Sequence, residues 1–384
     1  MSVPRPRVAR IPGLLAAIAA ISAGLAAPAT PAAAVTGPEA TAGQLPAVVK
    51  LRLGDEADAR ACTGTLVDPV WVLTAASCFA ATPGTPVPAG KPALKATAVL
   101  RDGTTVDIAE IAPRDDRDAA LVRLTTPVTT LTPASPATGL PAPGTELTAA
   151  GFGRTKTEWV PDKLHTGTFT VDSTTSTSLA LTGKGTDALC KGDTGGPLLN
   201  SDGRIVGVNS RSWQGGCLGT PTTETRTGAV SARTDDLASW IQQTGTADWQ
   251  VPLVNASSGK CLEIDSSLLT NGTRAQQWTC YEMPTMRWNL RWAGNGWVVR
   301  NANSGKCLEI DNSLLTDGAG AQQWTCYDIP TQRWDLVKAG WGYWLKNRNS
   351  GKCLEIDNSL LTNGARAQQW TCHDMRTQEW TFSY

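Results

Sequence analysis

Histidine is almost absent from this chain, since His165 and His373 are the only two among 384 residues. The ten cysteines contain no C-x₂-C pair, the spacing that zinc sites commonly use. The sequence therefore indicates no metal site, and it implies no cofactor. Charged residues are also sparse at 18%, with 34 Lys+Arg against 34 Asp+Glu. A chain with this balance lacks the basic surface that nucleic acids and anionic membranes attract.

Long apolar runs are missing too, except near the N-terminus. Arginines at positions 5, 7 and 10 precede an alanine-rich segment over residues 11–27, and Ala32-Ala33-Ala34 follows. This order is typical of a secretory signal peptide. A membrane anchor is the alternative, but the run is short and ends in a proline-containing stretch. We expect residues 1–34 to be a signal peptide, and the protein to be secreted and extracellular, without membrane contact once the signal is removed.

Cysteine and tryptophan are the residues that the chain does have in quantity. Eleven of the 15 tryptophans follow residue 245, which argues for two different domains. The last six cysteines form pairs 19 residues apart that recur every 46 residues. An exported chain with ten cysteines is expected to form five disulfides. The spacing of the last six predicts Cys261–Cys280, Cys307–Cys326 and Cys353–Cys372.

Residues 35–246 contain short apolar segments separated by Gly, Pro, Asp and Thr. Ala47–Leu51, Trp71–Leu73 and Ala120–Leu124 are examples. Strand-sized segments without helical periodicity between them predict an all-β barrel or sandwich. One helix is expected over Asp235–Gln243, where two acidic residues stand at the start.

Several motifs follow one another in this part of the chain. They include T-A-A-S-C at residues 74–78, D-A-A-L-V at 118–122, A-G-F-G at 150–153 and G-D-T-G-G-P at 192–197. In content and order they resemble the trypsin/chymotrypsin family of serine proteases. The resemblance implies two packed six-stranded β-barrels, with Cys62–Cys78 and Cys190–Cys217 as disulfides.

The resemblance also locates a catalytic triad, and two of its positions are altered. Asp118 matches the aspartate of the family, whereas Ser77 replaces its histidine and Thr194 replaces its serine. A hydroxyl is not a useful base near neutral pH, and the extra methyl of threonine restricts χ1. The amides of Gly192 and Thr194 would form the oxyanion hole. Loss of base or nucleophile lowers turnover roughly 10⁶-fold, so we expect little or no peptidase activity.

The expected signal cleavage would create a new N-terminus at Val35-Thr36-Gly37-Pro38, which is similar to the activated start of this family. The resemblance implies an ion pair between the Val35 ammonium and Asp193. The alternative is a loose terminus that leads into the first strand.

The specificity pocket is harder to interpret from sequence. Ala188 stands where trypsins carry an aspartate, so a preference for basic substrates is not supported, and Asp187 is displaced by one residue. Ser210-Arg211 and Ser212-Trp213 both resemble the Ser-Trp pair that faces the pocket in this family.

After a polar connector over residues 244–248, residues 250–384 contain a threefold repeat. S-G-K-C-L-E-I-D begins at residues 258, 304 and 350, and A-Q-Q-W-T-C at residues 275, 321 and 367. Units this short must share one core. Alternation places Leu262 and Ile264 inward and Cys261, Glu263 and Asp265 on the other face. The closing tryptophans are expected in the core: Trp288, Trp334 and Trp380.

These motifs resemble the ricin-type β-trefoil lectin family, in which carboxylates and amides bind sugar hydroxyls and an aromatic ring stacks on the sugar. The resemblance implies a glycan or polysaccharide partner. The candidate binding residues are Glu263, Gln276 and Trp278 in unit one, Glu309, Gln322, Trp324 and Gln332 in unit two, and Glu355, Gln368, Trp370 and Gln378 in unit three.

Three departures from the lectin pattern qualify this assignment. Glutamate replaces the family's aspartate in all three units. In the closing motif of unit one, Met286 stands where units two and three have Gln332 and Gln378, so unit one is the weakest candidate. The candidate tryptophans are alternatively packing residues. The remaining departure is a threonine in place of an asparagine, at Thr285, Thr331 and Thr377.

Three functions follow from the two resemblances. The first is carbohydrate binding by the C-terminal domain, with an inactive front domain that holds a peptide or protein in its cleft. The second is an active extracellular serine-type endopeptidase that the lectin domain targets to a polysaccharide. The third is an inhibitor or decoy whose inactive cleft captures peptides.

Overall fold

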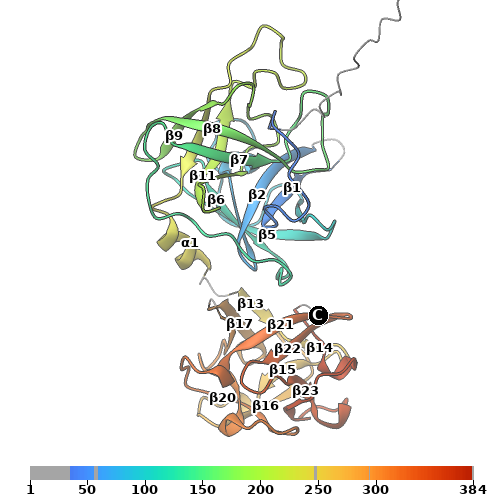
Figure 1. Cartoon of the computed structure of the whole chain (residues 1–384). Coiled ribbons are helices and arrows are strands. Elements are labelled where there is room, and N and C mark those ends of the chain that lie inside the picture. Colours follow the sequence, from blue (N-terminus) through green and yellow to red (C-terminus); the bar gives the residue numbers. More distant parts are fainter. Residues whose placement is uncertain (1–34, 56–58, 246–248, 294, 383–384) are drawn as a thin grey trace, which may run out of the picture. The chain divides into compact units, whose positions relative to one another are not determined.

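The computed structural model describes residues 35–55, 59–245, 249–293 and 295–382 (Figure 1). The expected signal peptide, and residues 246–248 of the expected connector, lie outside the described residues. Apart from one short α-helix and several 3₁₀ turns, the regular secondary structure of the described chain consists of β-strands, which confirms the all-β fold class.

The first half of the chain forms two closed barrels of six strands each, as the sequence predicts. Their hydrophobic interiors include Leu51, Leu73 and Leu121 in the first barrel, and Phe169 and Leu181 in the second. The first barrel has the order β1 (Val48–Leu53), β2 (Arg60–Asp68), β3 (Trp71–Thr74), β6 (Ala120–Leu124), β5 (Thr105–Pro113) and β4 (Ala96–Val99). The second has the order β10 (Pro197–Leu199), β11 (Ile205–Ser212), β12 (Ala229–Arg233), β9 (Ser178–Gly183), β8 (His165–Thr174) and β7 (Glu146–Gly151).

The single helix, α1, covers Ala238–Gly245 and so begins three residues later than predicted. Asp235 and Asp236 do not enter its first turn, because Arg233 and Arg117 hold them in ion pairs of 2.8 and 2.6 Å. Of the two pairs, that of Asp236 with Arg117 is a tertiary contact between residues 119 positions apart, and it competes with the acidic start signal that the sequence contains.

The C-terminal part folds into a further sheet of thirteen strands (Figure 1). Each repeat contains the same hairpin, with Glu263 opposite Gln276, Glu309 opposite Gln322 and Glu355 opposite Gln368. The strands are β13 (Trp249–Pro252), β14 (Val254–Asn255), β15 (Cys261–Ile264), β16 (Thr273–Trp278), β17 (Arg287–Trp292), β18 (Trp297–Asn301), β19 (Cys307–Ile310), β20 (Ala321–Trp324), β21 (Trp334–Ala339), β22 (Gly342–Asn347), β23 (Cys353–Ile356), β24 (Ala367–Trp370) and β25 (Trp380–Thr381).

The closing tryptophans are fully buried, as predicted for core residues. Each indole Nε1 donates a hydrogen bond of 2.9–3.0 Å to the carbonyl of Leu262, Leu308 or Leu354 in its own unit. Leu262 and Ile264 also lie in the core. The opposite face of this strand is not open, however, because Cys261 is fully buried and Glu263 is only 8% exposed. The disulfide and Gln276 cover that face.

Five disulfides are present, and they join the expected cysteines. Each of the three repeat disulfides closes a loop of 19 residues, which stabilises the fold by around 3 kcal/mol in the chain-entropy estimate. Within the described ranges, no helix has the length and hydropathy required to cross a membrane. Nor do those ranges contain a group of His, Cys, Asp and Glu side chains that is arranged to hold a metal ion.

Candidate functional site

The Asp118 carboxylate accepts hydrogen bonds from two serines, and all three residues line a groove in the barrel region. Ser77 lies on the 3₁₀ turn η1 (Ala76–Phe79), and its amide and hydroxyl donate hydrogen bonds of 2.7 and 2.8 Å to Asp118. Ser210, on β11, donates a third bond of 2.5 Å to Oδ2, the oxygen that also accepts from the Ser77 hydroxyl. Asp118 therefore contacts a serine hydroxyl at position 77, where an active triad requires a base that the aspartate orients.

Thr194 is half-buried in the loop before β10, and its hydroxyl donates to the backbone carbonyl of Ser210 at 3.2 Å. A nucleophilic hydroxyl requires a base within hydrogen-bond reach to accept its proton. The Ser77 hydroxyl is itself a donor toward Asp118. Among the described residues, the hydrogen bonds at this point of the groove join two hydroxyls and one carboxylate, and no imidazole is bonded to Thr194.

The loop around Thr194 takes its shape from the Asp193 carboxylate. This carboxylate is completely buried and accepts the amides of Gly153 and Cys190, both at 2.8 Å. A Cβ atom at Gly151 or Gly153 would come within 2.1–2.5 Å of Asp193 Oδ1, so only glycine fits in the A-G-F-G motif. Burial raises the pKa of Asp193 to about 7, although hydrogen bonds from the Cys190, Gly153 and Val35 amides act in the opposite direction.

Val35 is buried next to this carboxylate. Its backbone nitrogen is a hydrogen-bond donor to Asp193, and its side chain packs against Gly167. The next residue, Thr36, is bonded to Ala188 on both sides. Its amide donates to the Ala188 carbonyl at 3.1 Å, and its hydroxyl oxygen accepts the Ala188 amide at 2.7 Å. The backbone at Val35 has φ = 33°, which is an unfavourable value for a β-branched residue inside a continuous chain.

The amides of Gly192 and Thr194 have no hydrogen-bond acceptor within the part of the chain that is described. The segment is anchored from both sides, because Thr63 donates through its hydroxyl to the Gly192 carbonyl at 2.8 Å and through its amide to the Thr194 carbonyl at 2.9 Å. Two free donors on an anchored loop provide a place for a ligand carbonyl or carboxylate.

Ser77, Asp118, Gly192 and Thr194 all line one open groove of about 1390 Å³. His165 does not line it. That histidine begins β8, is 5% exposed, and has a pKa that burial lowers. The groove therefore has no imidazole from the described residues.

The two candidates for the Ser-Trp pair differ in their contacts, and only Ser210 contacts the Asp118 carboxylate. Ser210 holds Asp118, while the Ser212 hydroxyl donates to the Leu189 carbonyl at 2.6 Å. A register shift between Asn209 and Arg211, where β11 pairs with β12, inserts Ser210 as an extra residue. Sequence reasoning did not identify Ser210 as a partner of Asp118, because a bulge breaks the alternation on which such reasoning depends.

The candidate sugar-binding carboxylates lie in three similar side-chain clusters of the C-terminal domain, each formed by the Glu, Gln and Trp of one repeat and called a trefoil pocket below. All three are buried, at 6–8% exposure, and each accepts a hydrogen bond of 2.9–3.0 Å from the glutamine opposite on the hairpin. In units two and three a second glutamine donates to the other carboxylate oxygen, Gln332 to Glu309 at 2.7 Å and Gln378 to Glu355 at 2.9 Å. The sequence-predicted residues therefore come together unit by unit.

The candidate tryptophans are the exposed members of these pockets. Trp278 and Trp370 are 37% and 40% exposed, and Trp324 is half-buried. Each ring lies against a glycine turn of another repeat, since a Cβ at that glycine would lie 3.6–3.8 Å from the ring. The glycines have φ = 79–80° and face Trp278, Trp324 and Trp370 in the order Gly364, Gly272 and Gly318. An exposed aromatic ring beside a buried carboxylate provides both an apolar and a polar surface for a ligand.

Unit one differs from the others at Met286. Its sulfur accepts the Tyr281 amide at 3.2 Å, in the place where Gln332 accepts the Tyr327 amide. Glu263 consequently has one glutamine partner instead of two. Burial raises the pKa of Glu263, the Gln276 hydrogen bond lowers it, and the nearby Asp265 charge raises it further.

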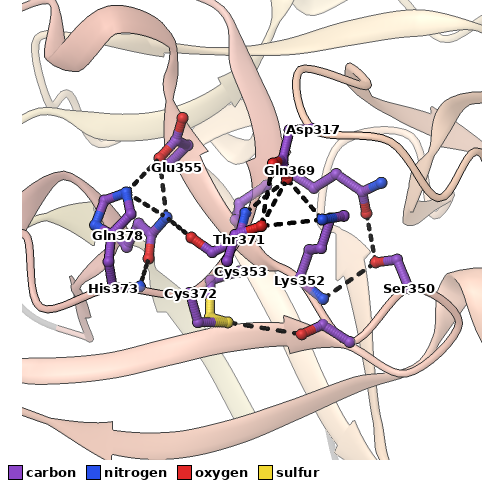
Figure 2. Close-up of a disulfide and its surroundings, with 12 residues drawn as sticks. Asp317, Ser350, Lys352, Cys353, Glu355, Gln369, Thr371, Cys372, His373 and Gln378 are labelled. Atoms are coloured by element: carbon purple, nitrogen blue, oxygen red, sulfur yellow. Dashed lines mark hydrogen bonds and ion pairs between the residues drawn. A yellow bond between two sulfur atoms is a disulfide. The ribbon is translucent and has the colours of Figure 1, made fainter.

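Unit three is distinguished by His373, which takes the place of a tyrosine (Figure 2). Its Nε2 lies 3.7 Å from Glu355 and 3.2 Å from Gln378 Nε2. On the opposite side of the disulfide shown in Figure 2, Asp317 accepts hydrogen bonds from Thr371 and pairs with Lys352 at 2.7 Å.

The threonines that replace the family's asparagine do not belong to the pockets. They are buried, and each hydroxyl donates to the carbonyl of the isoleucine that ends its C-L-E-I strand, at 3.1–3.2 Å. Sequence reasoning also missed the second glutamine of each A-Q-Q-W motif. Its threefold recurrence was the available signal. These glutamines are fully buried and donate to carbonyls of a neighbouring repeat: Gln277, Gln323 and Gln369.

Two family models match this chain, each over a different part of it. A family model described as Trypsin matches residues 34–241. A model described as Ricin-type beta-trefoil lectin domain-like matches residues 238–324, 284–370 and 330–384. Among solved structures, the designed 3-fold symmetric protein ThreeFoil is similar, with 29% sequence identity over 35% of this chain and 98% of that chain, at a TM-score of 0.35.

Proposed function

Because the chain belongs to the trypsin family and carries ricin-type lectin-like repeats at its C-terminal end, we propose that it is a secreted carbohydrate-binding protein whose protease-like domain is catalytically inactive. The ligand is a glycan or polysaccharide. The barrel groove acts as a binding site for a peptide or protein.

The observation that supports carbohydrate binding is the threefold recurrence of a buried glutamate, a glutamine and a tryptophan that is exposed in units one and three and half-buried in unit two. Sugars offer hydroxyls that donate to carboxylates, and apolar ring faces that stack on aromatic rings. Units two and three are the stronger sites, because a second glutamine orients each carboxylate from its other side.

Binding of the purified mature protein to a panel of immobilised neutral and acidic polysaccharides tests this proposal. The double variant Trp324→Ala/Trp370→Ala should lose most of the bound fraction, and Trp278→Ala should lose least. Trp341→Ala is the matched control, because Trp341 is 75% exposed in the same domain but does not belong to a pocket. Equal retention of the double variant and this control would contradict the assignment of the pockets.

The inactivity of the barrels is supported by the donor at Asp118, which accepts a hydrogen bond from the Ser77 hydroxyl where the family has an imidazole N–H. A fluorogenic peptide and labelled casein should show no turnover above buffer. Turnover that disappears in Thr194→Ala would contradict this proposal and favour the active endopeptidase instead.

Secretion with cleavage after Ala34 is part of the same proposal. The buried position of Val35 beside Asp193 supports a mature chain that starts there, because a free ammonium would neutralise a carboxylate that burial otherwise penalises. N-terminal sequencing of exported protein should read Val-Thr-Gly-Pro. Any other start contradicts the ion pair.

A further inference from the structure

A small cavity opens from the groove beside Thr194. It has a volume of about 160 Å³ and is lined by Leu189, Cys190, Lys191, Thr194, Asn209, Ser210, Arg211, Ser212 and Gln214. A cavity of roughly 150 Å³ accommodates a benzene-sized group, so one side chain of moderate size fits. Lys191, Thr194, Ser210 and Arg211 also line the groove, so a peptide lying in the groove reaches the cavity with one side chain.

The lining of this cavity is cationic. Lys191 and Arg211 are exposed, and neither has an ion-pair partner among the described residues. The described residues that form the wall include no Asp or Glu. The carboxylates bonded to wall residues are engaged behind the wall, since Asp118 accepts the Ser210 and Ser77 hydroxyls and Asp193 accepts the Cys190 and Gly153 amides. The Asp187 carboxylate accepts the Thr168 amide at 2.8 Å.

Asn209 adds a neutral donor to the same wall. Its side chain is completely buried, and its Oδ1 accepts a 3.1 Å hydrogen bond from the buried Ser231 hydroxyl, which orients the amide. Its Nδ2 is buried without an acceptor among the described residues. A buried amide donor costs free energy when it is unpaired, so this position favours a ligand that supplies an acceptor.

The hydroxyls of the wall are already engaged, that of Thr194 with the Ser210 carbonyl. The Ser210 hydroxyl donates to Asp118, and the Ser212 hydroxyl donates to the Leu189 carbonyl. Leu189 and the Cys190–Cys217 disulfide supply an apolar side. The cavity thus combines an apolar wall with donors and positive charge, which matches a side chain with a methylene stem and a carboxylate end.

We propose that this cavity binds a peptide carboxylate, and that Lys191, Arg211 and Asn209 make the groove selective for an acidic residue. The proposal deepens the peptide-binding role assigned to the groove above and rests on it. A carboxylate at the C-terminus of a peptide offers the same chemistry as a Glu side chain, so the test separates these two sources.

Four fluorescein-labelled peptides of one alanine-rich sequence are used as probes, and their binding to the mature full chain is followed by anisotropy. Three carry Glu, Gln or Lys at a central position and end in an amide. The fourth has alanine at that position and a free C-terminal carboxylate. The Glu peptide should bind at least tenfold more tightly than the Gln peptide, because hydrogen bonds to a charged group are stronger than those to its neutral isostere. The difference should shrink as salt is raised.

The surface variant Lys191→Gln/Arg211→Gln should abolish the preference for Glu over Gln. Arg52→Gln is the matched control, since Arg52 is an exposed cation of the groove that does not line the cavity. Asn209→Val tests the buried donor separately and should reduce the preference. Circular dichroism checks its fold, and the surface variant decides the question if Asn209→Val does not fold.

The outcomes are distinguishable. Equal binding of the Glu and Gln peptides overturns the selectivity and leaves peptide binding intact. Failure of all four peptides to bind overturns both the selectivity and the peptide-binding role of the groove, but not carbohydrate binding. Tight binding of the free-carboxylate peptide alone supports a carboxylate site and assigns its source to a chain terminus.

Discussion

The barrel groove and the trefoil pockets both depend on buried carboxylates, but they use them differently. In the groove, Asp193 accepts backbone amides and shapes the loop, while the hydroxyls of Ser77 and Thr194 lie at its edge. In the pockets, Glu309 accepts from Gln322 and Gln332, which are themselves candidate ligand-binding residues. In the groove, the carboxylate that supports the loop is therefore a different residue from the hydroxyls at the candidate reaction site. In the pockets, the same residues support one another and form the candidate ligand contacts.

The largest expected effect comes from restoring the groove's chemistry. If the supporting contacts are intact, the double change Ser77→His/Thr194→Ser should raise peptide hydrolysis by up to roughly 10⁶-fold over wild type, because base and nucleophile act as a unit. Each single change should gain little. Adding Asp118→Asn should remove about 10⁴ of the gain. Wild-type hydrolysis equal to that of the double variant would show that the groove was never inactive.

The supporting carboxylate of the groove should make stability depend on pH and on the N-terminus. The pKa of Asp193 is about 7 in the folded chain, above its ordinary value of 3.8, so the folded state binds more protons between these values. The free energy of unfolding therefore falls as pH rises from about 4 to 7, by up to about 4 kcal/mol.

A chain that starts at Val35 should escape most of this loss, because its ammonium favours the ionised carboxylate. A chain that starts at Ala32 should show the loss in full. Urea unfolding of both forms at pH 5 and pH 7.5 measures the difference. Identical pH dependence in the two forms would contradict an ion pair between Val35 and Asp193.

In the pockets, loss of a carboxylate should weaken stability and binding together. Glu309→Ala removes two hydrogen bonds to a buried carboxylate and leaves the Gln322 amide without an acceptor among the described residues, so it should cost about 3 kcal/mol. Glu263→Ala removes one such bond, and Gln276 keeps a 3.4 Å contact with Asp265, so it should cost about 1 kcal/mol. Chemical denaturation and polysaccharide binding measured on the same samples provide the comparison. Equal costs for the two variants would show that Met286 does not distinguish unit one.

The smallest effect on stability is expected at the exposed rings. Trp370 is 40% exposed, so Trp370→Ala should change the free energy of unfolding by only about 1 kcal/mol, while polysaccharide affinity falls about tenfold. Thermal unfolding and titration with the bound polysaccharide measure the two quantities. A large loss of stability with unchanged affinity would identify this ring as a packing residue.

Much of the fold could be predicted from sequence because its signals are local or periodic. The 19-residue spacing of the last six cysteines is confirmed as three disulfides, and the threefold motif as three matching hairpins. The two barrels follow from motifs that occur in order. The start of α1 could not be predicted, because Arg117 approaches Asp236 only in the folded chain.

By itself, the sequence determined which chemical groups are available: no histidine at position 77, a threonine at 194, and three copies of Glu-Gln-Trp. Only the tertiary structure decided where several of them act. It assigned Ser210 to Asp118, turned Asp187 toward Thr168, and left Asn209 Nδ2 buried without an acceptor among the described residues. The physical reason is that a bulge at Ser210 and contacts between distant strands set which side chains face a cavity.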